Sequence, residues 1–353
     1  MENLEKYFAE INGREFSVKE EQVNKAQQIR TFLRKLKTIR RNSVAEGASK
    51  NCTIINGYAV LKSKDVVSKP DRTQFEGYDI CRFSEWLISQ GVKTPKMYAL
   101  FYADKHYYEV FEQVKGSQLA LTSMDMVLKD VFGIGYDDSI KGDYTPEQRS
   151  LIGEYIFKYN RNAQKQILKL EDKHFDELLS SIIKMGRMGF VFMDTNPGNI
   201  LVNEDGFVLI DIDYEQTLQA FTERLEILTG KKCTTADVLK KLETNPRALT
   251  LLAGVDDTEK FDSDIAENFI FAFCSSCWYA SFLEEYHREY LYETDTIILK
   301  KVVDALTRAG IYFDLEKSKQ QTELFEALGR DYSRFYKVVE SQIPAYKEKK
   351  TMR

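Results

Sequence analysis

GFVFMDTNPGNILVNEDGFVLIDIDYEQ, residues 189–216, is the stretch of this chain that decides its fold. Within it, Asp194 precedes Asn199 by five positions, and Asp211 directly follows a second apolar run. The apolar residues on either side of Asn-Glu-Asp-Gly read as two short strands, because those four residues favour a turn. An ordinary hairpin with solvated acidic ends would share this spacing. The apolar strand that delivers Asp211 favours a catalytic loop instead.

Three oxygen-bearing side chains in this stretch suit the transfer of a phosphoryl group from a nucleotide. In such reactions one carboxylate orients or deprotonates the acceptor hydroxyl, while an amide oxygen and a second carboxylate hold magnesium on the phosphates. Magnesium takes oxygen ligands in a tight octahedron, usually with only one or two protein carboxylates. The pattern therefore predicts Asp194 as the catalytic residue and Asn199 and Asp211 as the magnesium ligands.

Residues 194–201, DTNPGNIL, resemble the catalytic loop of the protein-kinase-like superfamily, most closely that of the aminoglycoside and choline phosphotransferase branch. Residues 210–213, IDID, are similar to the metal-binding I-D-x-[DE] of that branch. The resemblance implies an α+β, two-lobed protein-kinase-like fold with a small β-rich N-lobe and a large helical C-lobe. One position departs from the family pattern: the usual His two residues before the catalytic Asp is Phe192 here. Packing of its ring is an alternative way to shape the loop.

The chain is expected to divide into three parts. Residues 1–37 form an N-terminal helical extension, residues 38–115 the N-lobe, and residues 116–353 a helical C-lobe with the catalytic loop and a C-terminal helical extension. Within the first part, residues 19–37 read as an amphipathic helix whose second face is basic. A solvated helix packed on the body is the favoured interpretation, and a site for an anionic partner is the alternative.

The N-lobe begins with two turn signals. Residues 54–61, IINGYAVL, predict a hairpin, because Asn-Gly fits a type I′ turn. Before it, residues 46–51, EGASKN, form a loop of small residues whose backbone N–H groups can come close to phosphate oxygens. This loop fits a plain turn as well, yet it resembles the G-[GA]-x-S-x-N loop of small-molecule kinases in the superfamily. The resemblance makes Gly47 and Ser49 candidate nucleotide-binding residues.

Lys62 ends the strand expected at 58–62, which resembles the V-A-I-K strand of kinases. The resemblance implies that Lys62 reaches the α- and β-phosphates of ATP. Its ammonium group would need a carboxylate partner from the helix expected at 71–90. Glu76 is the candidate and Asp79 its rival, because both share the apolar face of that helix.

A strand that starts at Tyr107 resembles the one that leads into the interlobe hinge of kinases. The resemblance implies that the backbone of Glu112 and Val114 pairs with the edge of adenine. That pairing uses main-chain groups, so the side chains reveal little, and an ordinary edge strand is the alternative.

The remaining chain reads as mostly helical. Thr145 begins a capping box with a proline at the first helical position. Residues 216–262 are expected to be helical and to set specificity, and their lack of an A-P-E motif favours the small-molecule branch or a divergent kinase. Asp264 resembles the Asp that opens a helix in the aminoglycoside branch, and an acid favoured by the helix dipole is the alternative. Residues 130–133, DVFG, only superficially resemble D-F-G.

Composition narrows the protein class. With 353 residues, 43% hydrophobic and 30% charged, the chain fits a globular protein of one large domain or two lobes. A net charge of −5 gives no global basic field, so nucleic acid is not expected as a partner. The sequence shows no membrane span and no signal-peptide layout, and its five Cys indicate a reducing compartment, so we expect a cytoplasmic protein. Cys274 and Cys277 are expected to be buried thiols on one helix rather than metal ligands.

The resemblance implies an enzyme that uses ATP and Mg²⁺ to move the γ-phosphate to a hydroxyl group. A small acceptor such as a sugar, an aminoglycoside or an amino alcohol is the first choice. A protein acceptor, as in divergent bacterial effector kinases, is the second. A pseudokinase that binds partners without chemistry is an alternative of another class, and transfer of AMP from reversed ATP is a further one.

Overall fold

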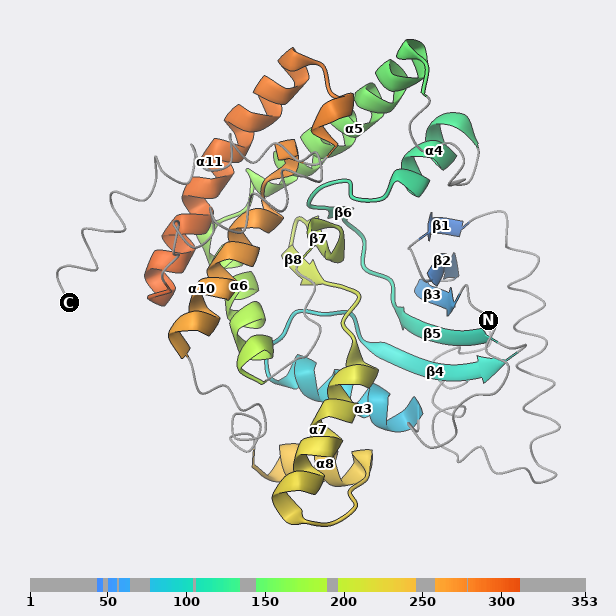
Figure 1. Ribbon diagram of the computed structural model, residues 1–353, viewed down its shortest axis with the longest axis vertical. Helices are drawn as coiled ribbons and strands as arrows, with labels where there is room; N and C mark the ends of the chain where they lie inside the picture. Colours follow the sequence, from blue (N-terminus) through green and yellow to red (C-terminus); the bar gives the residue numbers. More distant parts are fainter. Residues whose placement is uncertain are drawn as a thin grey trace. The chain divides into compact units, whose positions relative to one another are not determined.

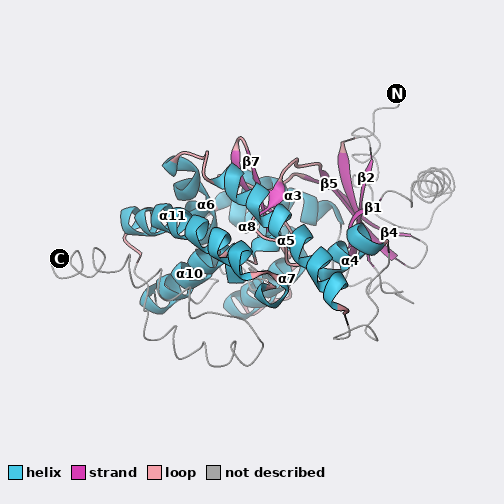
Figure 2. Ribbon diagram, turned by 90° about the horizontal axis from the view of Figure 1, so that it is seen from above, coloured by secondary structure: helices cyan, strands magenta, loops and turns pink. Residues whose placement is uncertain are grey.

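The computed structural model describes residues 43–46, 50–55, 57–63, 77–103, 106–133, 144–188, 196–245, 258–277 and 279–311. This part of the chain is α+β, with small antiparallel sheets and mostly helices (Figure 1, Figure 2). The α+β class expected from the sequence is therefore confirmed, whereas the helix expected at 19–37 lies outside the described residues. Two compact units are present: the first holds the described residues within 43–114 and 213–245, and the second those within 115–212 and 258–311.

The first unit is built on a five-stranded antiparallel sheet. Its strands lie in the order β1-β2-β3-β5-β4, with the bounds Ser43–Glu46 (β1), Lys50–Ile55 (β2), Tyr58–Ser63 (β3), Met97–Ala103 (β4) and His106–Glu112 (β5). β3 is therefore the central strand, paired with β2 on one side and β5 on the other. Val60 and Val110 face each other across β3 and β5 and are both buried, which anchors the middle of the sheet in the core.

The hairpin predicted at 54–61 is confirmed. Ile55 and Tyr58 are partners at the end of the β2–β3 ladder, so the connection is two residues long. Gly57 has a φ of 87°, the positive value that the second position of a type I′ turn requires. The Asn-Gly signal thus sets the register that places Lys62 on the central strand.

Three helices complete the first unit and lie together (Figure 1): Gly77–Ser89 (α3), Tyr214–Thr229 (α7) and Thr235–Thr244 (α8). Phe83 of α3 is fully buried and makes edge-on ring contacts with Tyr214 and Phe221 of α7. After α3, Gly91 has a φ of 81° and the Val92 N–H donates to the Leu87 carbonyl at 3.2 Å, which ends the helix.

The second unit packs helices around a small hairpin. Its elements are Ser117–Gln118 (β6), Met124–Phe132 (α4), Pro146–Ile167 (α5), Asp172–Arg187 (α6), Pro197–Asn199 (η3), Ile200–Asn203 (β7), Gly206–Leu209 (β8), Thr258–Ala272 (α10), Ser275–Cys277 (η4), Ala280–Phe282 (η5) and Glu285–Ala309 (α11). Strands β6, β7 and β8 form an antiparallel sheet in that order. None of the described helices in either unit combines the length and apolar character needed to cross a lipid bilayer.

Of the local predictions for this unit, one is confirmed and two are wrong. The capping box is confirmed, because Thr145 and Gln148 exchange hydrogen bonds at the start of α5. Gly133 caps the end of α4 with a φ of 69°, so the D-V-F-G run has a structural role. The idea that Asp264 opens a helix is wrong, since α10 begins at Thr258 and already includes it. The run around Cys274 is not one helix either, because α10 ends at Ala272.

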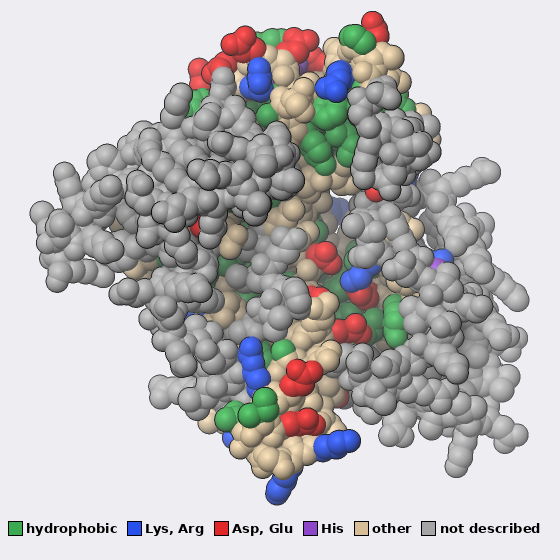
Figure 3. Space-filling view, in the orientation of Figure 1, with side chains coloured by type: hydrophobic (Ala, Val, Ile, Leu, Met, Phe, Trp, Pro, Cys, Tyr) green, Lys and Arg blue, Asp and Glu red, His purple; other side chains and the backbone are tan. Residues whose placement is uncertain are grey.

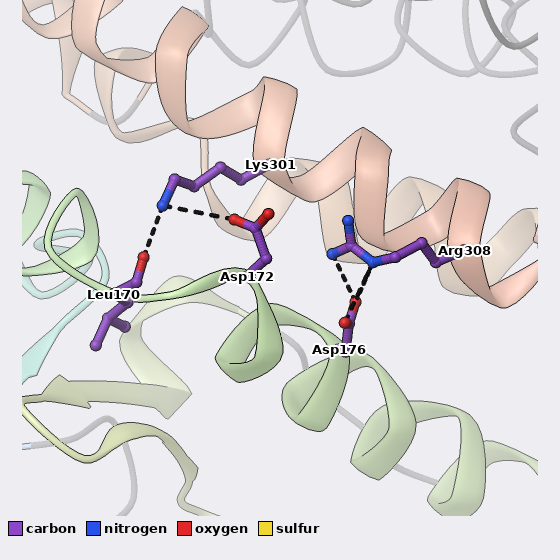
Figure 4. A network of polar contacts seen from close by, with 5 residues as sticks. All are labelled: Leu170, Asp172, Asp176, Lys301 and Arg308. Carbon is purple, nitrogen blue, oxygen red and sulfur yellow. Dashed lines mark hydrogen bonds and ion pairs between the residues drawn. The ribbon is translucent and has the colours of Figure 1, made fainter.

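Ion pairs tie α11 to the start of α6 (Figure 4). The Lys301 ammonium donates to the Leu170 carbonyl at 2.6 Å and lies 3.7 Å from a carboxylate oxygen of Asp172. The Arg308 guanidinium contacts Asp176 through two nitrogens, at 2.7 and 3.0 Å. These groups are partly exposed, so each pair contributes at most about 1 kcal/mol.

Large apolar side chains also remain exposed on α5 and α11, where acidic side chains are mixed among them (Figure 3): Leu151, Tyr286, Tyr290 and Ile297. Scattered exposed apolar residues are common on protein surfaces, so we assign them no function.

A buried polar cluster, the Asp295 cluster, joins α5, η4 and α11. It consists of Gln164, Ser275, Ser276 and Asp295. The Asp295 carboxyl accepts hydrogen bonds from the Gln164 amide at 2.7 Å, the Ser275 hydroxyl at 3.0 Å and the Ser276 N–H at 2.8 Å. Burial raises the pKa of Asp295 to about 6, and the three donors only partly offset this effect.

The raised pKa of Asp295 predicts a pH-dependent stability. The folded state holds this proton more tightly than the unfolded chain, so the group favours folding most below about pH 4. That contribution is lost as the pH rises to about 6. We expect Asp295→Asn to remove up to about 3 kcal/mol of this pH dependence, at about 1.4 kcal/mol per pKa unit.

Urea unfolding of the wild type and Asp295→Asn across this pH window measures the effect. Asp304→Asn, which changes an exposed acid on the same helix, is the matched control. A pH slope in Asp295→Asn equal to that of the wild type would contradict the prediction.

Candidate functional site

The β7–β8 hairpin brings the two predicted magnesium ligands together. Its ladder pairs Ile200 with Leu209, and the Ile210 N–H donates to the Asn199 carbonyl at 2.8 Å. Asn199 therefore lies opposite Ile210, and Asp211 is the next residue. The backbones of Asn199 and Asp211 thus lie at the same end of the hairpin.

Asp211 adopts an uncommon backbone conformation. Its φ is 56°, in the left-handed region, and its side chain is exposed. This region costs most L residues roughly 1–2 kcal/mol, although Asp and Asn tolerate it better. Such conformations concentrate at functional sites, where the surrounding structure holds them in place. The bend occurs directly after β8, at the position predicted to meet a ligand.

The turn that precedes Asn199 is held by its own residues. The Asn196 side-chain oxygen accepts a hydrogen bond from the Gly198 N–H at 2.9 Å, and the Asn199 N–H donates to the Asn196 carbonyl at 2.7 Å. Pro197 and Gly198 are buried, so the turn is part of the core. A Cβ atom added at Gly198 would overlap the Thr122 hydroxyl. Pro197 and Gly198 therefore occupy a tight, buried turn.

A neighbouring segment, residues 116–122, supports this turn through hydrogen bonds. The Gln118 side-chain amide donates to the Gly198 carbonyl at 2.8 Å. The Leu119 N–H lies 3.1 Å from the Pro197 carbonyl and 3.0 Å from the Ile200 carbonyl. Sequence reasoning missed this support, because the contacts join residues about eighty positions apart and no local sequence pattern indicates them.

The hairpin is also anchored in the core of the second unit. Phe207 of β8 is buried and makes edge-on ring contacts with Phe175 of α6 and Phe273, which follows α10. Phe175 belongs to the buried apolar face of α6, together with Leu178 and Leu179. This packing fixes the hairpin on its helices.

The predicted catalytic residue Asp194 lies outside the described residues. So does Phe192, which stands where the family pattern has a His. The chain is described up to Met188, just after α6, and again from Asn196. The assignment of Asp194 therefore stays a prediction.

The first unit carries the predicted nucleotide-binding residues. Lys62 is half-buried on β3 and is paired with Asn51 of β2 and Tyr108 of β5. Gly47 and Ser49 lie outside the described residues. The strands expected on either side of them are present as β1 and β2, whose Glu46 and Asn51 are partners.

The partner of Lys62 also stays a prediction. Glu76, the first candidate, precedes the described part of α3 and is outside it. Asp79, its rival, is buried and accepts a hydrogen bond from the Thr235 hydroxyl of α8 at 2.5 Å. Asp79 thus has a structural contact that sequence reasoning did not foresee.

The predicted hinge residues lie at the end of β5. The Glu112 N–H donates to the Lys96 carbonyl at 2.8 Å, and the Gln113 N–H donates to the Gly57 carbonyl at 3.0 Å. Val114 is half-buried, and the structure records no hydrogen bond from its N–H to another described residue. The pairing of this backbone with adenine stays a prediction.

No group of three His, Cys, Asp or Glu side chains with metal-binding geometry occurs among the described residues. Asn199 and Asp211 are a smaller donor set. Magnesium commonly uses one or two protein carboxylates together with water and the phosphates of a substrate, so the pair fits this ion.

Comparison with known proteins provides no identification: no protein-family model and no characterised protein matches the sequence.

The left-handed conformation of Asp211 predicts that a glycine variant at this position is more stable than an alanine variant, the reverse of the usual order. Glycine normally destabilises an ordered segment relative to alanine, but at a positive φ it relieves strain. We expect Asp211→Gly to exceed Asp211→Ala in the free energy of unfolding by about 1 kcal/mol. Urea unfolding of the two variants measures the difference. An alanine variant as stable as the glycine variant would show that position 211 carries no such strain.

Proposed function

We propose that this protein is an ATP- and Mg²⁺-dependent phosphotransferase with a two-lobed, protein-kinase-like fold. The observation that carries the proposal is the hairpin that places the backbones of Asn199 and Asp211 at one end, with Asp211 at a positive φ. An amide oxygen and a carboxylate from one hairpin end form a suitable ligand pair for magnesium on a nucleotide.

In this proposal the second unit supplies the groups that act at the transferred phosphate. Asp194 orients or deprotonates the acceptor hydroxyl, and Asn199 and Asp211 hold the magnesium ion. The ion would neutralise charge on the phosphate oxygens. Positioning and charge neutralisation account for most of the rate enhancement, and general base catalysis adds about 10²–10⁴-fold.

The first unit supplies the groups that hold the nucleotide. The strand order β1-β2-β3-β5-β4 supports this role, because it places Lys62 on the central strand and the hinge strand beside it. Lys62 binds the α- and β-phosphates with Glu76 as its partner, and the loop with Gly47 and Ser49 covers the phosphates. The backbone of Glu112 and Val114 binds the adenine edge.

A small hydroxyl-bearing molecule is the favoured acceptor, and a protein is the second choice. The segment after the metal-binding Asp supports the small molecule, because it forms the helices α7 and α8 and has no A-P-E motif. A pseudokinase is the alternative that a specific observation favours, namely Phe192 at the position of the usual His.

Asp211→Asn tests the proposal with little change to the fold, since asparagine also tolerates a positive φ. We expect turnover of labelled ATP, assayed against a metabolite panel and a cell lysate, to fall by a factor of about 10³, a size typical of a lost charge-stabilising group. The Mg²⁺-dependent part of the thermal shift by ATP should disappear with it.

Asp205→Asn is the control, because Asp205 is exposed at the opposite end of the same hairpin. Normal phosphate transfer by Asp211→Asn would end the assignment. ATP binding by a wild type without any turnover would favour the pseudokinase instead. The mass of the product distinguishes transfer of phosphate from transfer of AMP.

A further inference from the structure

Thr122 lies directly against the turn that carries Asn199. It is the last residue of the supporting segment 116–122. A Cβ atom added at Gly198 would overlap the Thr122 hydroxyl and lie 3.4 Å from the Thr122 Cβ. The position of Thr122 therefore limits where the Gly198 backbone can lie, and Asn199 is the next residue.

Thr122 is in turn fixed by Tyr279. The Tyr279 hydroxyl donates a hydrogen bond to the Thr122 carbonyl at 2.8 Å. Tyr279 has a φ of 53° and a ψ of 30°, a left-handed conformation that bulky residues rarely adopt. Its ring contacts Phe282 edge-on, with centroids 6.4 Å apart. Only Asp211 shares a positive φ among the described residues other than glycine.

The rest of the supporting segment has its own anchors in α5. The Gln118 N–H donates to the Tyr159 hydroxyl at 3.2 Å, and the Leu121 N–H donates to the buried Asn160 side-chain oxygen at 2.9 Å. Loss of the Tyr279 hydroxyl would therefore remove the hydrogen bond to the Thr122 carbonyl while these anchors stay in place.

We propose that Tyr279 and Thr122 are positioning residues for the magnesium ligand Asn199. The Tyr279 hydroxyl holds Thr122 in place, and Thr122 packs on Gly198, so that the turn keeps Asn199 at the hairpin end that Asp211 shares. This inference rests on the phosphotransferase function proposed above. Magnesium demands near-ideal octahedral geometry, so a small shift of one ligand weakens its binding.

The first test is Tyr279→Phe, which removes one hydroxyl and keeps the ring. We expect the Mg²⁺ concentration for half-maximal turnover to rise about tenfold, the lower end of the loss typical when a supporting partner of a metal ligand is removed. The KM for the acceptor should stay unchanged, and saturating Mg²⁺ should restore most of kcat. A merely structural role would lower stability without moving the Mg²⁺ requirement.

Tyr286→Phe is the matched control for that variant. The Tyr286 hydroxyl is exposed and lies 3.4 Å from the Glu154 carboxylate, within the pair α5 and α11. It makes no described contact with segment 116–122. We expect its Mg²⁺ requirement to equal that of the wild type.

The second test is a rescue experiment. Gly198→Ala should lose most turnover, because the new methyl group meets the Thr122 hydroxyl. Adding Thr122→Ala removes that hydroxyl and should restore activity at least about tenfold, a coupling expected only for residues in contact. Adding Thr122→Val instead keeps a methyl group in the same place and should give no rescue.

The outcomes separate the two proposals. A wild type with neither turnover nor a Mg²⁺-dependent thermal shift by ATP overturns the proposed function, and the positioning role with it. An active wild type leaves the function intact. In that case the positioning role fails if Tyr279→Phe has the wild-type Mg²⁺ requirement, or if Gly198→Ala with Thr122→Ala is no more active than Gly198→Ala alone.

Discussion

One hydrogen bond, from the Ile210 N–H to the Asn199 carbonyl, sets the geometry on which the candidate site depends. It extends the β7–β8 ladder by one pair beyond Ile200 and Leu209. Without it, the 3-10 turn before Asn199 and the bend at Asp211 would not be joined by a backbone hydrogen bond. With it, an amide and a carboxylate that are twelve positions apart share one hairpin end. The ring of Phe207 then fastens that hairpin to α6 and to the end of α10.

In both units, the described candidate residues lie on or directly beside regular elements. In the first unit, Lys62 occupies the central strand, so pairing on both sides limits its movement. In the second unit, the turn before Asn199 has its hydrogen bonds satisfied by Asn196, Gln118 and Leu119. Such support suits a site in which catalysis depends on placement more than on reactive side chains.

The parts of this structure that follow from local chemistry could be predicted from the sequence. The Asn-Gly hairpin, the capping box at Thr145 and the β7–β8 strands all depend on neighbouring residues. The support of Gly198 by Gln118 and the Asp295 cluster join distant segments, so no periodic pattern reveals them. The helix boundary near Asp264 was misjudged because a short motif was given more weight than the longer helical stretch around it.

The two-residue connection between β7 and β8 also limits how this chain can vary. Asn203 and Gly206 are partners, so the turn has no spare length, and Gly206 takes a φ of 116° beside the ring of His174. One added or deleted residue there would slip the ladder and exchange the inward and outward faces of a strand. Between Asn199 and Asp211 the protein should therefore accept new residue types far more readily than insertions or deletions.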